Sequence, residues 1–325
     1  MERRNFLKSS ISAAVGGVGV SPIGLSRETS KVVLITGCSS GFGYEMALVF
    51  ARAGYITYAS MRDRNGSNKG VADELEQIGL QEEISLYAVS LDITRSEQIL
   101  SAVEHIVETE GRLDVVVNNA GIFMYTPVEL VTEGMWNYQM RTNVFGPMEL
   151  VSTVMPQMRK QGSGLIVQVS SRVGQVVIPG ISLYCSSKAA LECATEAAHY
   201  EATRQGIDFA IIQPTAYGTS INPNARKIFR DFTLPELEKH RPQGTAHFSG
   251  FLQQLDRDFE GIPVRDPREV AELSLQIAET PRENRVLRYP IGDQWEADPL
   301  REINAFRSRQ QRQALSGRYE SWFRN

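Results

Sequence analysis

The sequence predicts an α/β fold in which one doubly wound, seven-stranded parallel sheet is covered by helices on both faces. Two observations support this prediction. From residue 31 onward, short runs rich in β-branched residues alternate with longer stretches of helical pattern. Several of the runs are continuously apolar, as expected of parallel strands that helices cover on both faces. No internal repeat or second domain is visible in this alternation.

Seven short segments are the expected strands, and in chain order they are KVVLITG (31–37), YITYASM (55–61), ISLYAVS (84–90), LDVVVNN (113–119), GLIVQVS (164–170), IDFAIIQ (207–213) and RVLRYPI (285–291). The expected helices lie between them, at residues 41–53, 71–78, 96–110, 132–160, 183–205 and 267–279. Five of these helices are followed by a glycine, where a left-handed residue commonly ends a helix: Gly54, Gly79, Gly111, Gly162 and Gly206.

Two stretches depart from this alternation. Residues 218–262 contain prolines and five phenylalanines but no strand-like run. The phenylalanines recur at roughly helical spacing, which favours a structured cap over the site rather than disordered padding. Residues 298–323 have the pattern of a charged amphipathic helix, which we interpret as a packing element or an oligomer contact.

The first 30 residues resemble a bacterial twin-arginine export leader. Arg3 and Arg4 stand in the segment RRNFLK (3–8), ahead of a weakly apolar run at 11–20. That run is shorter than the ~20 residues that a membrane-spanning helix needs. The leader predicts export by the twin-arginine machinery and a periplasmic or envelope-associated protein. The alternatives are a cytoplasmic protein with a non-functional extension, and a protein that an uncleaved leader attaches to the membrane.

The composition excludes several classes of function. A net charge of −4 and a pI of about 5.7 leave no basic footprint for nucleic acid. The three cysteines are scattered, and the four histidines are isolated, so the sequence predicts neither a disulfide framework nor a metal site. Apolar residues make up 42% of the chain, which is enough for a sizeable core.

A glycine-rich turn follows the first expected strand, with the sequence TGCSSGFG (36–43). Such a turn lets backbone N–H groups approach a diphosphate, and the next helix directs its positive N-terminus at the charge. The sequence therefore predicts a dinucleotide site here, as in a Rossmann-type domain. The candidate cofactor-binding residues of this turn are Gly37, Ser39, Ser40, Gly41, Phe42 and Gly43.

The spacing TGxxxGxG resembles that of the classical short-chain dehydrogenases/reductases. Two further motifs of that family follow in the same order, NNAG at 118–121 and YCSSK at 184–188. Ser171 stands thirteen residues before the tyrosine, as the family serine does, and Asn143 matches the family's helix asparagine. The resemblance covers residues 31–295. It implies that residues 31–325 form one catalytic domain, with homodimers or homotetramers as the usual assembly.

The residue types agree with the chemistry of that family. Tyr184 and Lys188 are four residues apart, so they share one face of a helix. A nearby ammonium and an oxidised nicotinamide both favour the phenolate, and Tyr184 then exchanges a proton with a substrate oxygen. Ser171 is placed to hydrogen-bond the same oxygen. Taken singly, these residues also suit a helix-start aromatic, a solvated lysine and a capping serine.

The resemblance assigns further roles around this group. It implies that Asn143 holds a water that connects Lys188 to solvent, and that Lys188 also binds the nicotinamide ribose. Asp92 matches the residue that contacts the adenine, and Thr219 the residue that binds the carboxamide. Asn119 and Gly121, from the NNAG motif, and Tyr184 itself also belong to the expected cofactor-binding set.

Two positions bear on the choice and geometry of the cofactor. The second expected strand ends with Met61 where NAD-preferring relatives carry an acid, and Arg62 follows. A guanidinium pairs well with a 2′-phosphate, which predicts NADP rather than NAD; the alternative is a solvated arginine that pairs with Asp63. After the sixth strand the family's Pro-Gly is Pro214-Thr215 here, so the local backbone near the nicotinamide is expected to differ.

The sequence thus predicts an NADP-dependent oxidoreductase that interconverts a carbonyl and a secondary alcohol. The segment at 266–292 resembles the NADP-preferring branch with hydroxysteroid and retinol dehydrogenases, which favours a medium-sized apolar substrate. The alternative is a non-catalytic dinucleotide-binding sensor or scaffold. The complete set of catalytic candidates, Asn143, Ser171, Tyr184 and Lys188, argues against that alternative.

Overall fold

The structure is a computed structural model that describes residues 30–258 and 265–316. Contacts along the chain divide it into two units, residues 1–30 and 31–325, and the fold described below belongs to the second. The predicted leader therefore lies outside the described residues, as do 259–262 of the predicted cap and 317–323 of the predicted C-terminal helix.

The described residues contain seven strands in one sheet, and every neighbouring pair is parallel. The strands are β1 (Val32–Ile35), β2 (Ile56–Met61), β3 (Leu86–Ser90), β4 (Val115–Asn118), β5 (Gly164–Val169), β6 (Ile207–Pro214) and β7 (Arg288–Ile291). Their spatial order is β3-β2-β1-β4-β5-β6-β7, which confirms the predicted doubly wound sheet. The order in which successive strands are added reverses between β1 and β4, and in such sheets ligands bind at the carboxyl ends of the strands beside this point.

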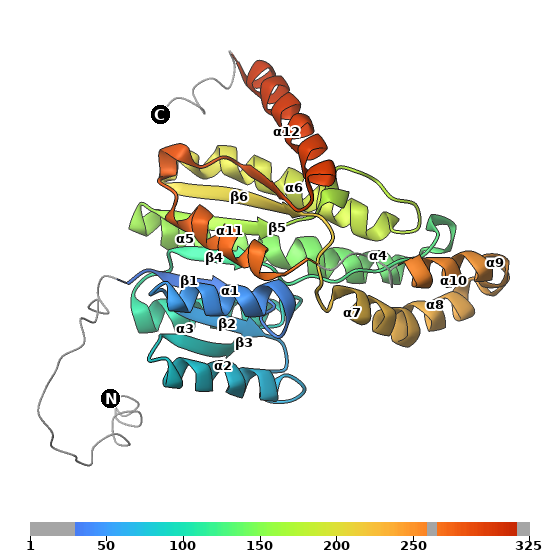
Figure 1. Cartoon of the computed structure of the whole chain (residues 1–325), viewed down its shortest axis with the longest axis horizontal. Helices are drawn as coiled ribbons and strands as arrows, with labels where there is room; N and C mark the ends of the chain where they lie inside the picture. Colours follow the sequence, from blue (N-terminus) through green and yellow to red (C-terminus); the bar gives the residue numbers. More distant parts are fainter. Residues whose placement is uncertain (1–29, 259–264, 317–325) are drawn as a thin grey trace, which may run out of the picture. The chain divides into compact units, whose positions relative to one another are not determined.

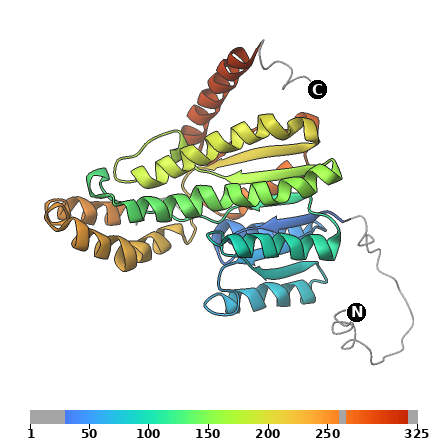
Figure 2. The same ribbon diagram turned by 180° about the vertical axis from the view of Figure 1, so that it is seen from behind.

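Helices cover both faces of the sheet. In Figure 1, α1 (Gly41–Arg52) and α11 (Arg268–Glu279) lie in front of the strands, and α2 (Lys69–Gln81) lies below β3; the three helices share one apolar core. Figure 2 shows the other face, with α3 (Ser96–Glu110), α5 (Gly146–Gln161) and α6 (Ser182–Ala202). Side chains alternate along β1 between these layers: Val33 and Ile35 pack in the first core, Val32 and Leu34 in the second.

The predicted helix at 132–160 is two helices joined by a π-helical turn. Its first part is α4 (Glu133–Met140), the turn covers Arg141–Phe145, and α5 follows. At Gly146, just after the turn, a Cβ atom would stand 2.1 Å from the carbonyl oxygen of Ile93. A π turn inserts a residue into the helical repeat and re-aims the side chains within it, which here include Asn143.

Four of the five predicted helix-ending glycines adopt the left-handed backbone, with φ of 89° at Gly54, 73° at Gly111, 68° at Gly162 and 82° at Gly206. The prediction for Gly79 is wrong, because α2 continues past it to Gln81. Gly79 is buried where this helix meets β3, and a Cβ atom there would stand 3.2 Å from the Leu86 carbonyl oxygen. Close packing, not helix termination, accounts for this glycine.

The segment expected as a cap is helical where the structure describes it. It comprises α7 (Ile221–Ile228), a π-helical turn (Phe229–Thr233), α8 (Leu234–His240), α9 (Pro242–His247) and α10 (Ser249–Asp258). These helices lie beside α4, beyond the end of the sheet (Figure 1). Phe229, Phe232 and Phe248 pack with Leu237 and Met135 in one apolar cluster. The segment is therefore held by apolar packing against the main domain, because most of the buried members of this cluster lie in residues 122–135 and at the start of α6.

The last helix, α12, covers Gln294–Leu315 and so begins four residues before the predicted start at 298. Its first turns are tied to the domain by an ion pair of 2.7 Å between Glu296 and Arg172, and Asn304 is buried. Its C-terminal half extends away from the sheet (Figure 1).

Candidate active site

One pocket opens at the carboxyl ends of the central strands. The glycine-rich turn contributes Phe42 to its wall, and the end of β5 contributes Ser171. Tyr184, from the first turn of α6, lies in the same wall. Thr219 and Ile221, which follow β6, line the pocket on the side of the cap. The pocket therefore joins the predicted cofactor turn to the predicted catalytic residues.

The glycine-rich turn is shaped by positions that exclude a side chain. A Cβ atom at Gly43 would stand 2.3 Å from the carbonyl oxygen of Gly37 and 2.6 Å from Asn119 Nδ2. Gly37 and Gly41 both have positive φ, of 74° and 57°. Asn119 ties the turn to the end of β4, because its Nδ2 donates to the carbonyl oxygens of Thr36 (2.8 Å) and Gly37 (3.2 Å).

The start of α1 is open to an anion. Ser40 is the residue before the helix, and its side chain makes no capping hydrogen bond. The first N–H groups of the helix are consequently free of a side-chain cap, and they carry the positive end of the helix dipole. A Cβ atom on Gly41 would stand 3.1 Å from Thr219 Cβ, which places Thr219 directly against this turn. Ser39 lies in the turn that leads from β1 to α1.

Tyr184 and Lys188 share one face of α6, as predicted. The ammonium nitrogen of Lys188 lies 5.6 Å from the centre of the Tyr184 ring and donates to the carbonyl oxygen of Val169 at 2.8 Å. Ser171 follows β5, and its Oγ accepts a hydrogen bond from the N–H of Val173 at 3.3 Å. This bond orients the serine side chain beside the tyrosine in the pocket wall.

Asn143 lies behind this group and is buried. Its Oδ1 accepts from the N–H of Ile122 (2.8 Å), and its Nδ2 donates to the Ile122 carbonyl (2.9 Å) and to Ser187 Oγ (3.0 Å). A Cβ atom on Gly121 would stand 3.4 Å from Asn143 Oδ1 and 3.7 Å from Lys188 Nζ. The backbone at Gly121 thus brings Asn143 and Lys188 together.

Burial controls the protonation of the two central groups. It raises the pKa of Tyr184 to about 12, although hydrogen bonding to Ser171 acts in the opposite direction. Burial lowers the pKa of Lys188 to about 8, and the charge of Glu192 opposes this shift. In the protein alone Tyr184 is therefore a protonated phenol at neutral pH, and the expected shift toward the phenolate depends on the oxidised nicotinamide. In this state Tyr184 is a proton donor.

The expected adenosine side is formed by the ends of β2 and β3. Arg62 is exposed directly after β2, and within the described part of the chain its side chain makes no hydrogen bond or ion pair. Asp63 instead accepts a 2.7 Å bond from the Ser67 N–H. Asp92 follows β3, and its Oδ1 accepts hydrogen bonds from the N–H (2.9 Å) and the hydroxyl (2.7 Å) of Thr94.

The departure at Thr215 is accommodated by a glycine on the neighbouring strand. Thr215 extends the pairing of β6 with β7, since its N–H donates to the carbonyl oxygen of Ile291 at 3.0 Å. Gly292 has a φ of 140°, and a Cβ atom there would stand 1.7 Å from Thr215 Oγ1. The threonine side chain therefore occupies the space that a side chain at residue 292 would need.

The sequence did not identify the apolar wall between Ser171 and Tyr184. Val173, Ile178 and Ile181 line the pocket there and pack with Phe123 in one apolar cluster. The sequence did contain a signal for this wall: the segment between Ser171 and Tyr184 begins and ends at predicted site residues, so its side chains are expected to lie near the site. Arg172 also lines the pocket and is paired with Glu296 of α12.

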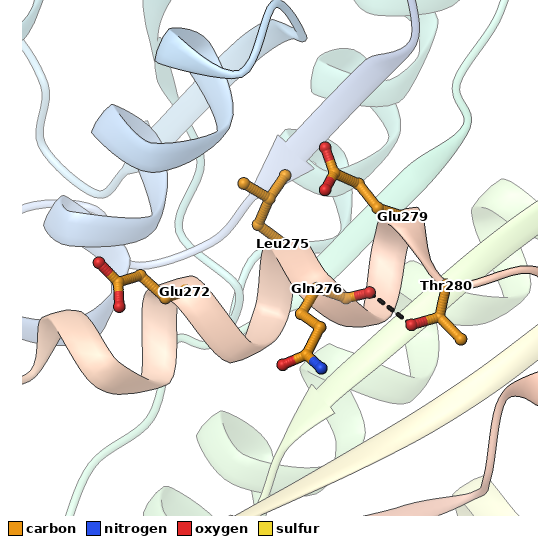
Figure 3. A pocket seen from close by; sticks show the side chains of 5 residues that line it. All are labelled: Glu272, Leu275, Gln276, Glu279 and Thr280. Atoms are coloured by element: carbon orange, nitrogen blue, oxygen red, sulfur yellow. Dashed lines mark hydrogen bonds between the residues drawn. The ribbon is translucent and has the colours of Figure 1, made fainter.

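A second hollow lies on α11 and carries none of the predicted site residues. Figure 3 shows its lining of Glu272, Leu275, Gln276, Glu279 and Thr280, with the Thr280 hydroxyl donating to the Gln276 carbonyl at 2.6 Å. Among the residues that the structure describes, no cluster of side chains could hold a metal ion. In the same residues no helix combines the length and the apolar character that crossing a membrane requires.

Comparison with known proteins agrees with this geometry. A sequence profile described as short chain dehydrogenase matches residues 31–228. The chain belongs to this family. A short-chain dehydrogenase from Streptomyces avermitilis, 28% identical, superimposes with a TM-score of 0.66 over 88% of this chain and 97% of its own.

The chain described here is also similar to two curated oxidoreductases. It is 32% identical over 264 residues to YusZ, an uncharacterized oxidoreductase of Bacillus subtilis, covering 81% of this chain and 89% of the relative. It is 34% identical over 194 residues to a 3-ketodihydrosphingosine reductase of Bacteroides thetaiotaomicron, covering 60% of this chain and 66% of that enzyme. The protein is an oxidoreductase of the short-chain dehydrogenase/reductase family, with a Rossmann-type nucleotide-binding fold.

Proposed function

We propose that this enzyme interconverts a carbonyl and a secondary alcohol with NADP(H), on a medium-sized apolar substrate. The observation that carries the proposal is one pocket whose wall holds Ser171 and Tyr184 together with Phe42 of the glycine-rich turn. The turn fits a dinucleotide, because Gly43 leaves no room for a side chain and the start of α1 is uncapped. When bound, the nicotinamide supplies or accepts the hydride.

In the proposed reduction, the substrate oxygen lies between the hydroxyls of Ser171 and Tyr184. Ser171 holds the carbonyl in line for hydride transfer and stabilises the developing oxyanion. Tyr184 donates its proton to that oxygen, a role that suits a phenol held protonated by burial. In oxidation the same residue takes the proton from the alcohol.

The remaining candidates support these two residues. We propose that Lys188 binds the nicotinamide ribose and that its ammonium favours the phenolate that forms when Tyr184 gives up its proton. The Tyr184 phenolate then recovers a proton from the Lys188 ammonium, and a water held at Asn143 returns a proton to Lys188 from solvent. Asn119, Gly121 and Thr219 contact the nicotinamide half, and Asp92 the adenine.

The apolar wall supports the substrate class. Phe123, Val173, Ile178 and Ile181 surround the space in front of Tyr184, and burying one methylene in such a pocket contributes ~0.8 kcal/mol. The Bacteroides relative is named for reduction of a sphingosine ketone, which is also a largely apolar substrate.

A ketone series tests this proposal. We expect kcat/KM for straight-chain aliphatic ketones with NADPH to rise about fourfold for each added methylene until the pocket is filled. The measurement is oxidation of NADPH followed by absorbance, with water-soluble keto acids as the matched polar set. A preference for the keto acids would contradict the apolar assignment, and no turnover of any carbonyl would contradict the proposed reaction.

The NADP preference rests on Arg62. Its guanidinium is exposed after β2 and is not engaged by Asp63, so it is available to a 2′-phosphate. We expect Arg62→Glu to lower the preference for NADPH over NADH about 10- to 100-fold, because a charged hydrogen bond is replaced by repulsion.

Arg64→Gln is the control for this change. Arg64 donates to the carbonyl oxygen of Ala88 at 2.9 Å and pairs with Glu76. Its substitution therefore alters the loop but keeps the guanidinium of Arg62. Steady-state kinetics with both cofactors gives the ratio. An unchanged ratio in Arg62→Glu would remove the basis for the NADP assignment.

We also propose that the enzyme is a homodimer or homotetramer and that residues 1–30 direct its export by the twin-arginine machinery, folded around its cofactor. These proposals rest on the family and on the segment RRNFLK (3–8). The molar mass in solution tests the first. The N-terminal mass in envelope and cytoplasmic fractions tests the second: cleaved protein in the envelope supports export, and intact protein confined to the cytoplasm contradicts it.

A further inference from the structure

One face of α6 contacts the end of β5 at three successive turns. Tyr184, Lys188 and Glu192 are each four residues apart and therefore lie above one another on the helix. Lys188 Nζ binds the carbonyl oxygen of Val169, and Ser170 Oγ donates to Glu192 Oε1 at 2.8 Å. The first two turns thus carry the proposed catalytic residues Tyr184 and Lys188. On the third turn Glu192 binds Ser170, the residue between Val169 and Ser171.

Glu192 is a fully buried carboxylate, with 1% of its surface exposed. Besides Ser170, it accepts hydrogen bonds from Gln213 Nε2 (3.0 Å to each oxygen), Gln175 Nε2 (2.9 Å) and Arg288 Nε (3.3 Å). Burying a charge costs several kcal/mol unless it is paired and hydrogen-bonded. Even a well-paired buried charge often stabilises the fold no more than apolar residues of similar volume would in its place. Stability alone therefore gives little reason for a carboxylate here.

The partners of Glu192 come from elements far apart in the sequence. Gln213 is the last residue but one of β6, Arg288 begins β7, and Gln175 follows the turn after Ser171. Asn304 of α12 closes the network, because its Nδ2 donates to Gln213 Oε1 (2.7 Å) and its Oδ1 accepts from Gln175 Nε2 (2.9 Å). One carboxylate thus connects two strands and two helices at a point directly behind the proposed catalytic residues.

Resting on the proposed function, we propose that Glu192 is a positioning residue for the reaction. It fixes the strand end at 169–171 against α6 and so sets the position of the Ser171 hydroxyl relative to Tyr184. Its carboxylate also lies one helical turn beyond Lys188. Gly174 accommodates this packing, because a Cβ atom there would stand 3.0 Å from Glu192 Oε1 and 3.2 Å from the Lys188 backbone.

The charged groups near Lys188 determine in which direction the pKa of Lys188 should change when the charge of Glu192 is removed. Tyr184 lies on the turn before it and Glu192 on the turn after it; Arg288, from β7, pairs with Glu192 and with Glu196. Burial lowers the pKa of Lys188 to about 8, and Glu192 opposes that shift. Removing the Glu192 charge should lower the pKa of Lys188 further, so that the ammonium is lost at a lower pH.

The test compares Glu192→Gln with Glu196→Gln in the full-length enzyme. Glu196 lies one turn further along the same helix and shares Arg288, but it has no contact with Ser170, Gln175 or Gln213 among the hydrogen bonds of the described residues. We expect Glu192→Gln to lower kcat about tenfold and to move the alkaline limb of the kcat/KM profile to lower pH. The KM for NADPH should change less than about twofold. Glu196→Gln should leave the limb in place.

A second variant separates the two parts of the proposal. Ser170→Ala removes the contact to the strand end and keeps the carboxylate, so we expect kcat to fall while the alkaline limb stays unchanged. Thermal unfolding and NADPH binding of each variant identify any loss of folding. If Glu192→Gln does not fold, an unchanged kcat in Ser170→Ala overturns the positioning role.

One readout is independent of turnover. We expect the Lys188 resonance, followed by NMR of lysine labelled at Cε, to titrate at a lower pH in Glu192→Gln than in Glu196→Gln. Equal titration in the two variants overturns the proposal, whether or not a carbonyl substrate is found. If the wild-type enzyme turns over no carbonyl but the Lys188 titration still differs between the two variants, the proposed function is contradicted and the electrostatic role of Glu192 is supported.

Discussion

Tyr184→Phe is expected to lower kcat for carbonyl reduction by about 10²- to 10⁴-fold, the usual contribution of a positioned proton donor. The phenyl ring fills the same space beside Phe123, whose ring centre lies 5.0 Å away, so packing is preserved. Only the hydroxyl is lost, and with it the proton that burial holds on Tyr184 at neutral pH. Single-turnover oxidation of NADPH measures the effect on the chemical step.

Cofactor binding is the control for this variant. The glycine-rich turn lies on β1 and α1, outside the substituted residue, so the Kd for NADPH should stay within about threefold of the wild-type value. A Tyr184→Phe enzyme that keeps its turnover would assign the proton to another group. Retention of the biological output without turnover would instead support the sensor or scaffold that the sequence left as an alternative.

Gly43→Ala is expected to raise the Kd for NADPH at least about 100-fold and to destabilise the fold by about 1–3 kcal/mol. The added methyl group would meet the carbonyl oxygen of Gly37 at 2.3 Å and Asn119 Nδ2 at 2.6 Å. The first is a backbone atom of the turn that approaches the diphosphate, so the turn itself must move. Fluorescence titration with NADPH and chemical unfolding measure the two effects.

Gly70→Ala is a matched control, because it makes the same change in a helix. Gly70 lies in α2 with no atom within 4 Å of an added Cβ and no positive φ. We expect it to leave the Kd unchanged and to raise stability by about 0.5–1 kcal/mol, as alanine favours the helix. If Gly43→Ala binds NADPH as tightly as Gly70→Ala does, the turn is not the diphosphate site.

The sheet was predictable because its signal is local. Strands in the middle of a buried parallel sheet are continuous apolar runs, and those at 31–37 and 113–119 contain β1 and β4 of the structure. The grouping of Ser171, Tyr184 and Lys188 could likewise be predicted, since helical spacing and the end of a strand place these residues without knowledge of distant contacts.

The features that the sequence did not reveal depend on distant contacts. Gln175 meets Asn304 across 129 positions, and neither amide stands in a recognisable motif. The π turn around Asn143 and the role of Gly79 follow from close approaches to Ile93 and Leu86, which no helical period indicates. The ammonium and an oxidised nicotinamide were expected to lower the pKa of Tyr184, whereas the burial that raises it in the protein alone depends on contacts that no motif indicates.

The position of Asn304 near the end of the chain has a consequence for biosynthesis. The residues that surround Glu192 come from positions 170, 175, 213 and 288, and Asn304 is the last of them to be synthesised. A nascent chain that already contains the cofactor turn and the tyrosine still lacks the side chain that joins Gln175 to Gln213. The strand end at 169–171 therefore gains the last side chain of this network only after translation has passed residue 304, so that a product truncated before that residue keeps the nucleotide turn without a fully braced reaction centre.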